Sequence, residues 1–185
     1  QKRKDWNGLI SGFKASDLVF LDESGCNTDM TRRYAYSLGG SRAVDSAPLS
    51  KPKNTTILSS IQLDGTLRYT TFSGGTTVER FKRYLETDLL PHLNGNSVLI
   101  MDNMKSHHAK AVKNLLDSSE IRYIYLPPYS PDLNPIEKLW SKVKAFLRKF
   151  KARTLDALPN AIQNAFHSVT ISDCSGWFRF CGYAL

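Results

Sequence analysis

Three acidic residues, Asp22, Asp102 and Glu137, stand where carboxylates could do chemistry. Asp22 follows the apolar run 18–21, and Asp102 follows a second apolar run, 98–101. Parallel pairing of these runs would bring both carboxylates to one edge of a sheet. Glu137 comes directly after a proline-rich loop, which can hold it opposite the two aspartates. Three converging carboxylates repel one another unless a cation lies between them, and hard oxygen ligands select Mg²⁺ or Mn²⁺. The pattern predicts divalent-metal chemistry on phosphates.

Each acid taken alone also fits a simpler role. An Asp after a strand commonly serves a turn or caps a helix. Glu137 could do no more than complement the dipole of the helix that it opens. His107 and His108, which follow the second acid, are of a type found more often in solvated loops than as ligands.

The spacing of apolar residues predicts the elements that position the acids. Strands are expected at 18–21, 55–63, 67–72, 97–101 and 121–126. Helices are expected at 76–91, 108–118, 136–150, 155–168 and within the tail 171–185. The turn Asp64-Gly65 favours a hairpin between the second and third strands. This order predicts the ribonuclease H fold, an α/β class with a mixed five-stranded sheet flanked by helices, in which the fourth strand lies parallel beside the first.

The helix expected after Pro135 has two distinct faces. Its apolar stripe recurs at helical spacing and consists of Ile136, Leu139, Trp140, Val143, Leu147 and Phe150. Glu137 lies on another face, together with Ser141, Lys144 and Arg148. An acid followed by bases along one face suits a metal site with phosphate contacts beside it.

The charge balance favours a polyanionic partner. Against 17 Asp and Glu stand 25 Lys and Arg, which gives a net charge of +8 and a pI near 9.4. The stretch 138–153 contains no acid. Its predicted contacts with double-stranded DNA are Lys138, Lys142, Lys144, Arg148, Lys149 and Lys151. A merely solvated basic face is the simpler alternative.

Composition excludes several other classes of protein. The chain has 185 residues, 41% of them hydrophobic, which is enough for the core of a globular domain. No run approaches the roughly 18 apolar residues of a membrane helix, so no membrane partner is expected. Cys26, Cys174 and Cys181 are odd in number and lack Cys-x-x-Cys spacing, which argues against a disulfide framework or a structural zinc. A reducing, cytoplasmic compartment fits this pattern.

Three segments closely resemble the DDE catalytic domain of mariner-type transposases, in particular their bacterial insertion-sequence branch. They read FLDESG at 20–25, IMDN at 100–103 and LPPYSPDLNPIEKLW at 126–140. Between Asp102 and Glu137 lie positions 103–136, or 34 residues, which is the spacing class of that superfamily. The last motif is long and therefore specific.

The resemblance implies a ribonuclease H-like catalytic domain over residues 18–185. In it Asp22, Asp102 and Glu137 would bind two Mg²⁺ or Mn²⁺ ions, with Asn103 and His107 assisting. The enzyme would act in the bacterial cytoplasm on nucleoid DNA, and it would work as a homodimer in the DNA complex. It would cut transposon ends and join them to target DNA, usually at a TA dinucleotide.

The resemblance also bears on the segments outside the catalytic motifs. The family usually has an N-terminal helix-turn-helix region, for which residues 1–17 leave no room, so these are expected to be a linker remnant of a missing DNA-binding region. The loop 26–53 contains Arg32, Arg33 and Arg42, which are candidates for contact with DNA or a partner subunit.

Two other functions stay open at this point. A ribonuclease H-like nuclease that cuts RNA·DNA hybrids would use the same acids. An inactive or domesticated relic would bind DNA without cutting it.

Overall fold

The protein is built on one mixed sheet of five strands in the order β3-β2-β1-β4-β5. The computed structural model describes residues 2–32, 34–49 and 52–183. The strands are β1 Leu18–Cys26, β2 Thr55–Ile61, β3 Leu67–Ser73, β4 Val98–Met101 and β5 Arg122–Tyr125. β1, β2 and β3 pair antiparallel, whereas β4 lies parallel to both β1 and β5. The predicted sheet, with the fourth strand parallel beside the first, is confirmed.

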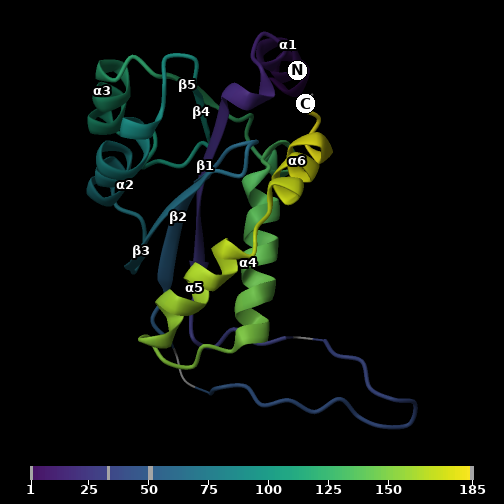
Figure 1. Cartoon of the computed structure of the whole chain (residues 1–185). Coiled ribbons are helices and arrows are strands. Elements are labelled where there is room, and N and C mark those ends of the chain that lie inside the picture. Colours follow the sequence, from purple (N-terminus) through teal and green to yellow (C-terminus); the bar gives the residue numbers. More distant parts are fainter. Residues whose placement is uncertain (1, 33, 50–51, 184–185) are drawn as a thin grey trace.

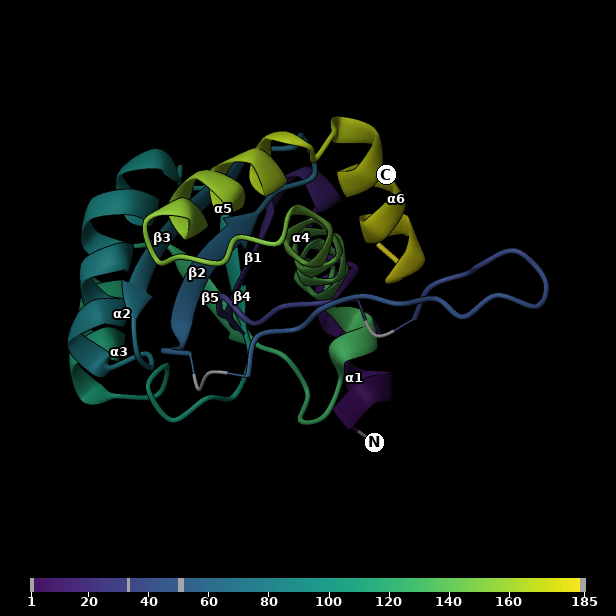
Figure 2. The ribbon, with the colours of Figure 1, turned by 90° about the horizontal axis from the view of Figure 1, so that it is seen from below.

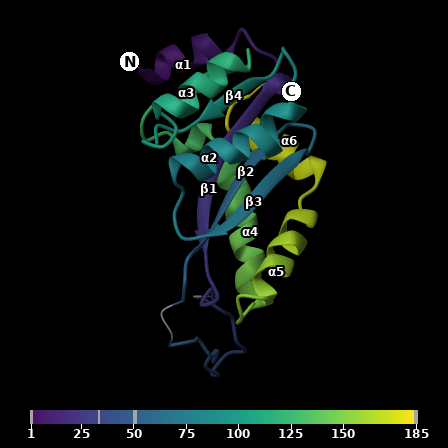
Figure 3. The ribbon, with the colours of Figure 1, turned by 90° about the vertical axis from the view of Figure 1, so that its left-hand side faces the viewer.

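Helices cover both faces of this sheet (Figures 1 and 2). The α-helices are α1 Lys2–Ile10, α2 Val78–Tyr84, α3 Lys110–Ser118, α4 Ile136–Phe150, α5 Ala157–His167 and α6 Ile171–Phe180. Shorter helical turns are η1 Ala15–Asp17, the π-helical η2 Leu85–Leu89, η3 Leu90–His92 and η4 Pro131–Leu133. α2 and α3 lie over one face of the sheet, in front of it in Figure 3, and α4 and α5 lie over the other.

The alternation of side chains along β1 divides the core into two clusters. Leu18 and Phe20 pack with residues of α4, α5 and α6 on one face. Val19 and Leu21 pack with residues of α2 and α3 on the other face. Successive side chains of a strand point to opposite faces, so the two acids that follow Leu21 belong to different faces as well.

β1 is longer than the sequence indicated. Its parallel pairing with β4 ends at Leu21 and Met101, as expected from the end of the apolar run. Its antiparallel pairing with β2 continues to Cys26, so Asp22 lies within the strand instead of in a turn. The hydrogen bonds between β1 and β2 are made by backbone groups. The change to polar side chains after Leu21 therefore does not mark the end of the strand.

Residues 2–17 form helix α1 and the turn η1 where a linker was expected. Trp6 is 3% exposed and belongs to the core cluster under α4 and α6, and Ile10 and Phe13 pack against that cluster. The segment therefore packs on the domain. Its basic and polar sequence has little helical periodicity, so the sequence did not predict a helix here. The missing DNA-binding region before it stays a prediction.

The segment between β1 and β2 extends from one end of the domain as a long arm (Figure 1). We use "the arm" for its described residues, 27–32, 34–49 and 52–54, which contain no helix or strand. Arg153 holds the base of the arm, because its Nη1 donates to the carbonyls of Thr28 at 3.0 Å and Met30 at 3.2 Å. Arg32 and Arg42 lie on the arm and are exposed, whereas Arg33 lies outside the described residues.

Helix α4 buries most of its predicted stripe. Ile136, Leu139, Trp140, Val143 and Leu147 are buried, whereas Phe150 is 45% exposed. The helix ends one residue later at Lys151, whose left-handed backbone (φ 56°, ψ 48°) closes the last turn. Phe150 therefore lies at the last helical position, where its ring stacks on that of Phe146 with 6.0 Å between centroids and stays partly open to solvent. Across the described residues, no helix is both long and apolar enough to cross a membrane.

Candidate active site

Asp22 and Asp102 become neighbours at the point where β4 ends. Leu21 and Met101 form the last parallel pair, so each acid occupies the next position on its own chain. Both side chains line a cleft of about 550 Å³, and Glu137 lines it from the start of α4. The structure therefore brings the three predicted acids to one cavity.

Glu137 is positioned by a loop that is tied down at both ends. Leu126 begins the loop, and its amide donates to the carbonyl of Met101 at 2.8 Å. Near the other end, the hydroxyl of Tyr183 donates to the carbonyl of Leu133 at 2.6 Å. The amide of Glu137 donates to the carbonyl of the buried Asn134 at 3.1 Å, which sets the first turn of α4. Glu137 itself is exposed to the cleft.

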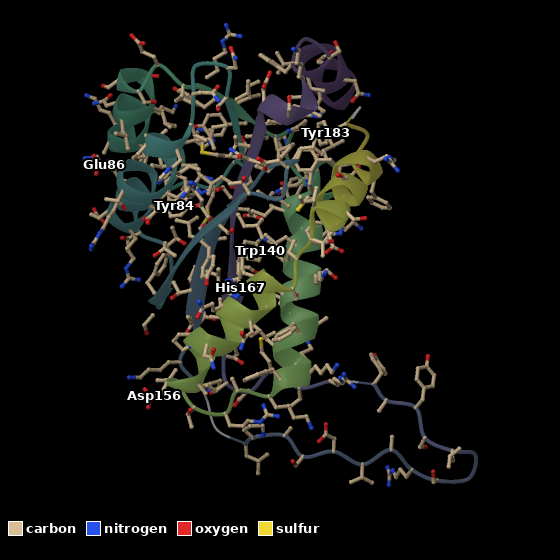
Figure 4. The ribbon with its side chains drawn as sticks, viewed as in Figure 1. Tyr84, Glu86, Trp140, Asp156, His167 and Tyr183 are labelled. Atoms are coloured by element: carbon tan, nitrogen blue, oxygen red, sulfur yellow. The ribbon has the colours of Figure 1, made fainter. Side chains whose placement is uncertain are left out.

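Asp22 is buried, with 8% of the residue exposed. Its Oδ1 accepts from the amide of Glu23 at 2.8 Å, and its Oδ2 accepts from the indole Nε1 of Trp140 at 3.2 Å. Figure 4 shows Trp140 on α4. Burial raises the pKa of Asp22 to about 7, and the charges of Asp102, Glu137 and Glu23 add to the rise while the Glu23 amide opposes it. The cleft thus concentrates negative charge.

Asp102 has a different environment from Asp22. Its Oδ1 accepts from the amide of Met104 at 2.9 Å and lies 2.8 Å from Nδ1 of His107. Burial alone would raise the pKa of this carboxyl, but the hydrogen bonds from His107 and Met104, together with the charge of the imidazole, hold it below its usual range. Asp102 is therefore the more strongly stabilised carboxylate of the two.

His107 lies behind Asp102, and its side chain is fully buried. It is not among the residues that line the cleft. Its Nε2 lies 3.2 Å from Oε2 of Glu23, and its ring stacks on Phe81 with 4.2 Å between centroids. Burial alone would lower the pKa of His107, but hydrogen bonds and charges from Asp102 and Glu23 raise it to about 9. The predicted assisting residue thus supports an acid and does not face the cavity.

Asn103, the other predicted assisting residue, does line the cleft. Its Nδ2 donates to the carbonyl of Leu126, and its Oδ1 lies 3.3 Å from Nε2 of His108. The amide therefore joins the end of β4 to the start of the proline loop.

Two contributors to the site were not singled out from the sequence. Trp140 was assigned only to the apolar stripe of α4, although an indole N–H on a buried face needs an acceptor. Glu23 was included only as a member of the FLDESG segment at 20–25. Continuing the strand alternation past Leu21 would have separated Glu23 from Asp22 and placed it on the face of α2 and α3.

The donor set suits a hard divalent cation. In the part of the chain that the structure describes, no three His, Cys, Asp or Glu side chains gather closely enough to hold a metal ion as they stand. The three acids nonetheless share one cleft, and the raised pKa of Asp22 reflects in part the like charges around it. Carboxylate oxygens are preferred ligands of Mg²⁺ and Mn²⁺, and a cation would relieve this repulsion.

The basic residues near α4 fall into two groups. Three already contact protein: Nζ of Lys138 lies 3.9 Å from the ring centroid of Phe180, Lys142 binds Asp173 at 2.5 Å, and Lys151 binds Asp45 at 2.5 Å. The other three, Lys144, Arg148 and Lys149, have no salt bridge or hydrogen bond to any residue described. Two of these lie on the face of Glu137, so the uncommitted charge continues from the cleft along the helix.

The sheet order and the three acids of the cleft define a ribonuclease H-like domain. A family model described as DDE superfamily endonuclease matches residues 17–159, and the chain belongs to this family. Among curated proteins, it is 28% identical over 97 residues to the Transposable element Tc1 transposase of Caenorhabditis elegans, covering 50% of this chain and 36% of that protein. It is 29% identical over 75 residues to the Tcb2 transposase of Caenorhabditis briggsae, covering 40% and 28%.

Solved structures support the same fold. The Mos1 transposase paired-end complex with left transposon end superposes with a TM-score of 0.80 at 18% identity, covering 96% of this chain and 57% of that one. The Mos1 mariner paired-end complex with Mn gives 0.77 at 20% identity, covering 95% and 54%. The chain thus spans only about half of these transposase chains and about a third of the curated Tc1 relative.

Proposed function

We propose that this chain is the catalytic domain of a DNA transposase that works by cut-and-paste. The observation that carries the proposal is the gathering of Asp22, Asp102 and Glu137 around one cleft, in a domain of the DDE endonuclease family. The similarity to the Tc1, Tcb2 and Mos1 transposases supports the same activity.

The three acids would hold Mg²⁺ or Mn²⁺, and we propose two ions in each active site. The family likeness includes a Mos1 complex with Mn and another with Mg, which supports a divalent ion here. When bound, such ions supply Lewis-acid stabilisation of charge on the phosphate and leaving oxygens. The three acids offer carboxylate oxygens, which are the hard ligands that Mg²⁺ and Mn²⁺ prefer.

The chain's own residues would position and align the reacting groups. Trp140 holds Asp22 from the side of α4, and His107 holds Asp102 from the side of α2 and α3. Lys144 and Arg148 would contact phosphates beside the cleft. Water would attack a phosphodiester at the transposon end, breaking its P–O bond and leaving a 3′-OH. That 3′-OH would then attack a phosphodiester of the target, usually at a TA dinucleotide, releasing the target's own 3′ oxygen.

The arm supports a second subunit in the DNA complex. Five of its large hydrophobic side chains are 87% to 105% exposed: Tyr34, Tyr36, Leu38, Val44 and Leu49. An apolar series of this kind on a projecting segment fits a protein partner better than solvent. We assign that role to a second copy of the chain, in a homodimer that brings two transposon ends together.

The remaining assignments follow from the motif wording. The proline-rich motif at 126–140 favours the bacterial insertion-sequence branch, which would place the enzyme in the cytoplasm, acting on the nucleoid. Recognition of the transposon ends would reside in a DNA-binding region preceding this domain.

The test is a metal-dependent nicking and strand-transfer assay on pre-cut DNA ends, with Glu137→Gln as the paired variant. We expect products with Mg²⁺ or Mn²⁺ and none with Glu137→Gln. Ca²⁺ should bind but support little reaction, because its looser and longer coordination aligns the reacting oxygens poorly. Faster cutting of an RNA·DNA hybrid than of duplex DNA would instead indicate a ribonuclease H-like nuclease. DNA binding without any product, in either metal, would indicate an inactive relic.

A further inference from the structure

Two consecutive acids of β1 approach the catalytic cleft from opposite faces of the sheet. Asp22 accepts from Trp140 on α4, within the cluster under that helix. Glu23, one residue later, has its Oε2 3.2 Å from Nε2 of His107, which stacks on Phe81 of α2. Strand alternation requires this separation. Glu23 thus lies on the α2 and α3 side of the sheet, whereas Asp22 is held from the α4 side.

The imidazole of His107 joins Glu23 to Asp102. Its Nδ1 lies 2.8 Å from Oδ1 of Asp102, while its Nε2 faces Glu23, so each ring nitrogen has a carboxylate oxygen as partner. The ring is fully buried. Its backbone is also fixed, because its amide donates to the carbonyl of Met104 at 3.0 Å and its carbonyl accepts from the hydroxyl of Tyr125 at 2.9 Å.

We propose that Glu23 is a positioning residue of the active site, which fixes the carboxylate of Asp102 through the imidazole of His107. The inference rests on the proposed function, in which Asp102 is a ligand of the catalytic ion. It adds a fourth carboxylate to the site and gives it a role distinct from those of Asp22, Asp102 and Glu137.

The physical reason lies in the two ring nitrogens. A buried ring nitrogen without a partner is costly, so the imidazole adopts the orientation that satisfies both. Glu23 supplies the acceptor for Nε2, which leaves Nδ1 directed at Asp102 as a donor. Without Glu23, the ring loses the partner that fixes its orientation, so it is free to rotate and Asp102 loses a fixed donor. A partner of this kind behind a ligand typically changes metal affinity about 10- to 100-fold.

A rival role for Glu23 is direct contact with the ion. Glu23 is among the residues that line the cleft, and its Oε1 is buried without a hydrogen-bond partner in the described chain. If Glu23 contacts the ion directly, replacing Glu23 should weaken metal binding even in a chain that lacks His107. Positioning predicts an effect that disappears with His107, so the two roles are separable.

The first experiment needs no metal. Proton–nitrogen NMR of the chain should show two slowly exchanging ring N–H signals for His107. Glu23→Gln keeps the shape and an acceptor oxygen but loses the charge, so the Nε2–H signal should move while Nδ1–H persists. Glu86→Gln, at an exposed acid of η2 (labelled in Figure 4), should move neither. An Nε2–H signal unmoved by Glu23→Gln would overturn the proposed contact.

The second experiment is calorimetric titration with Mn²⁺. Glu23→Leu and His107→Phe should each weaken binding about tenfold, and the double variant should bind no more weakly than either single one, because residues acting as a unit are non-additive. Glu23→Gln should keep most of the affinity. Additive losses, or a Gln variant as weak as the Leu variant, would assign Glu23 to the ion itself and overturn the positioning role.

The outcomes separate this inference from the proposed function. A wild-type chain that fails to bind Mn²⁺ would contradict the metal site, while the ring signals would still decide whether Glu23 holds His107. If the wild-type chain binds Mn²⁺ and Glu23→Leu binds it equally tightly, the metal site is supported and the proposed role of Glu23 is overturned. Thermal unfolding of each metal-free variant checks that the fold is retained. If Glu23→Leu does not fold, the same titrations are made with Glu23→Gln and with the double variant Glu23→Gln, His107→Phe.

Discussion

The cleft lined by the three acids and the arm differ in how the fold holds their side chains. In the cleft, Asp22 and Asp102 are each held by a buried partner on a different face of the sheet, Trp140 and His107 respectively. On the arm, Tyr36 and Leu49 are as exposed as in an extended chain, at 105% and 103%. The first region takes its geometry from the fold, whereas the second offers apolar surface that the fold does not use. Changes in the cleft should therefore affect chemistry, and changes in the arm should affect assembly.

The largest effect should come from the acids themselves. We expect Asp22→Ala, Asp102→Ala or Glu137→Ala to reduce both cleavage and joining by at least about 10³-fold, because each removes a ligand from the charge-stabilising site. The melting temperature should hold for Glu137→Ala, which relieves repulsion between carboxylates, whereas Asp102→Ala should lower it because Nδ1 of the buried His107 loses its carboxylate partner. Strand-transfer assays and thermal unfolding would measure the two properties. Near wild-type cleavage by any one variant would exclude that residue from the site.

A smaller effect should follow from removing one donor to Asp22. Trp140→Phe keeps an aromatic ring in the core but deletes the Nε1 hydrogen bond of 3.2 Å. Hydrogen bonds to charged groups contribute about 1.5–3 kcal/mol, so metal-dependent cleavage should fall roughly tenfold or more. Trp177→Phe on α6, where no hydrogen bond to an acid of the cleft is lost, is the matched control. If both variants cut DNA equally well, the indole contact does not position Asp22.

How far the sequence predicted these two regions depends on what each residue contacts. The apolar runs at 18–21 and 98–101 are buried on both faces, so their pattern predicted the parallel pair and placed Asp22 and Asp102 side by side. The motif at 126–140 predicted that Glu137 would join the two aspartates. In these places local pattern and tertiary environment agree.

Other features depend on contacts between distant segments, which no local pattern records. The bond from Trp140 to Asp22 joins positions 118 residues apart, and that from His107 to Glu23 joins positions 84 apart. The burial of Trp6 likewise depends on the core that forms beneath it. Lys142 and Lys151 were predicted to contact DNA from charge alone, whereas their partners, Asp173 and Asp45, come from α6 and the arm.

The arm should respond in the reverse manner to the cleft. Tyr36→Ser combined with Leu38→Ser removes exposed apolar surface, so the free energy of unfolding should change by less than about 0.5 kcal/mol. Cutting of single ends should persist, while the complex that joins two ends should form less. Native gels with labelled ends would measure this, with Leu155→Ser, an exposed apolar residue off the arm, as control. Normal pairing of ends by the double variant would contradict an interface role for the arm.

The smallest effect should be a difference between two lysines of the same helix. Lys142 is paired with Asp173 at 2.5 Å, whereas Lys144 has no ion pair with a described residue and shares a face with Glu137. For the whole chain, log affinity for duplex DNA should fall linearly with log salt at about 0.9 per neutralised phosphate. Lys144→Gln should reduce that slope by roughly one such contact, and Lys142→Gln should change it less, because Lys142 already has a protein partner.

The same titrations test where sequence is read. Phosphate contacts position DNA without reading it, and the strands and buried helix faces of this domain leave none of the described elements evidently free to enter a major groove. The slopes should therefore be alike on a transposon end and on scrambled DNA. A preference for the end of about 10³ or more, the range of specific recognition, would contradict the assignment of recognition to a preceding region. Equal slopes for Lys142→Gln and Lys144→Gln would show that the pair with Asp173 opens when DNA binds, so the basic surface would then extend around α4 toward α6.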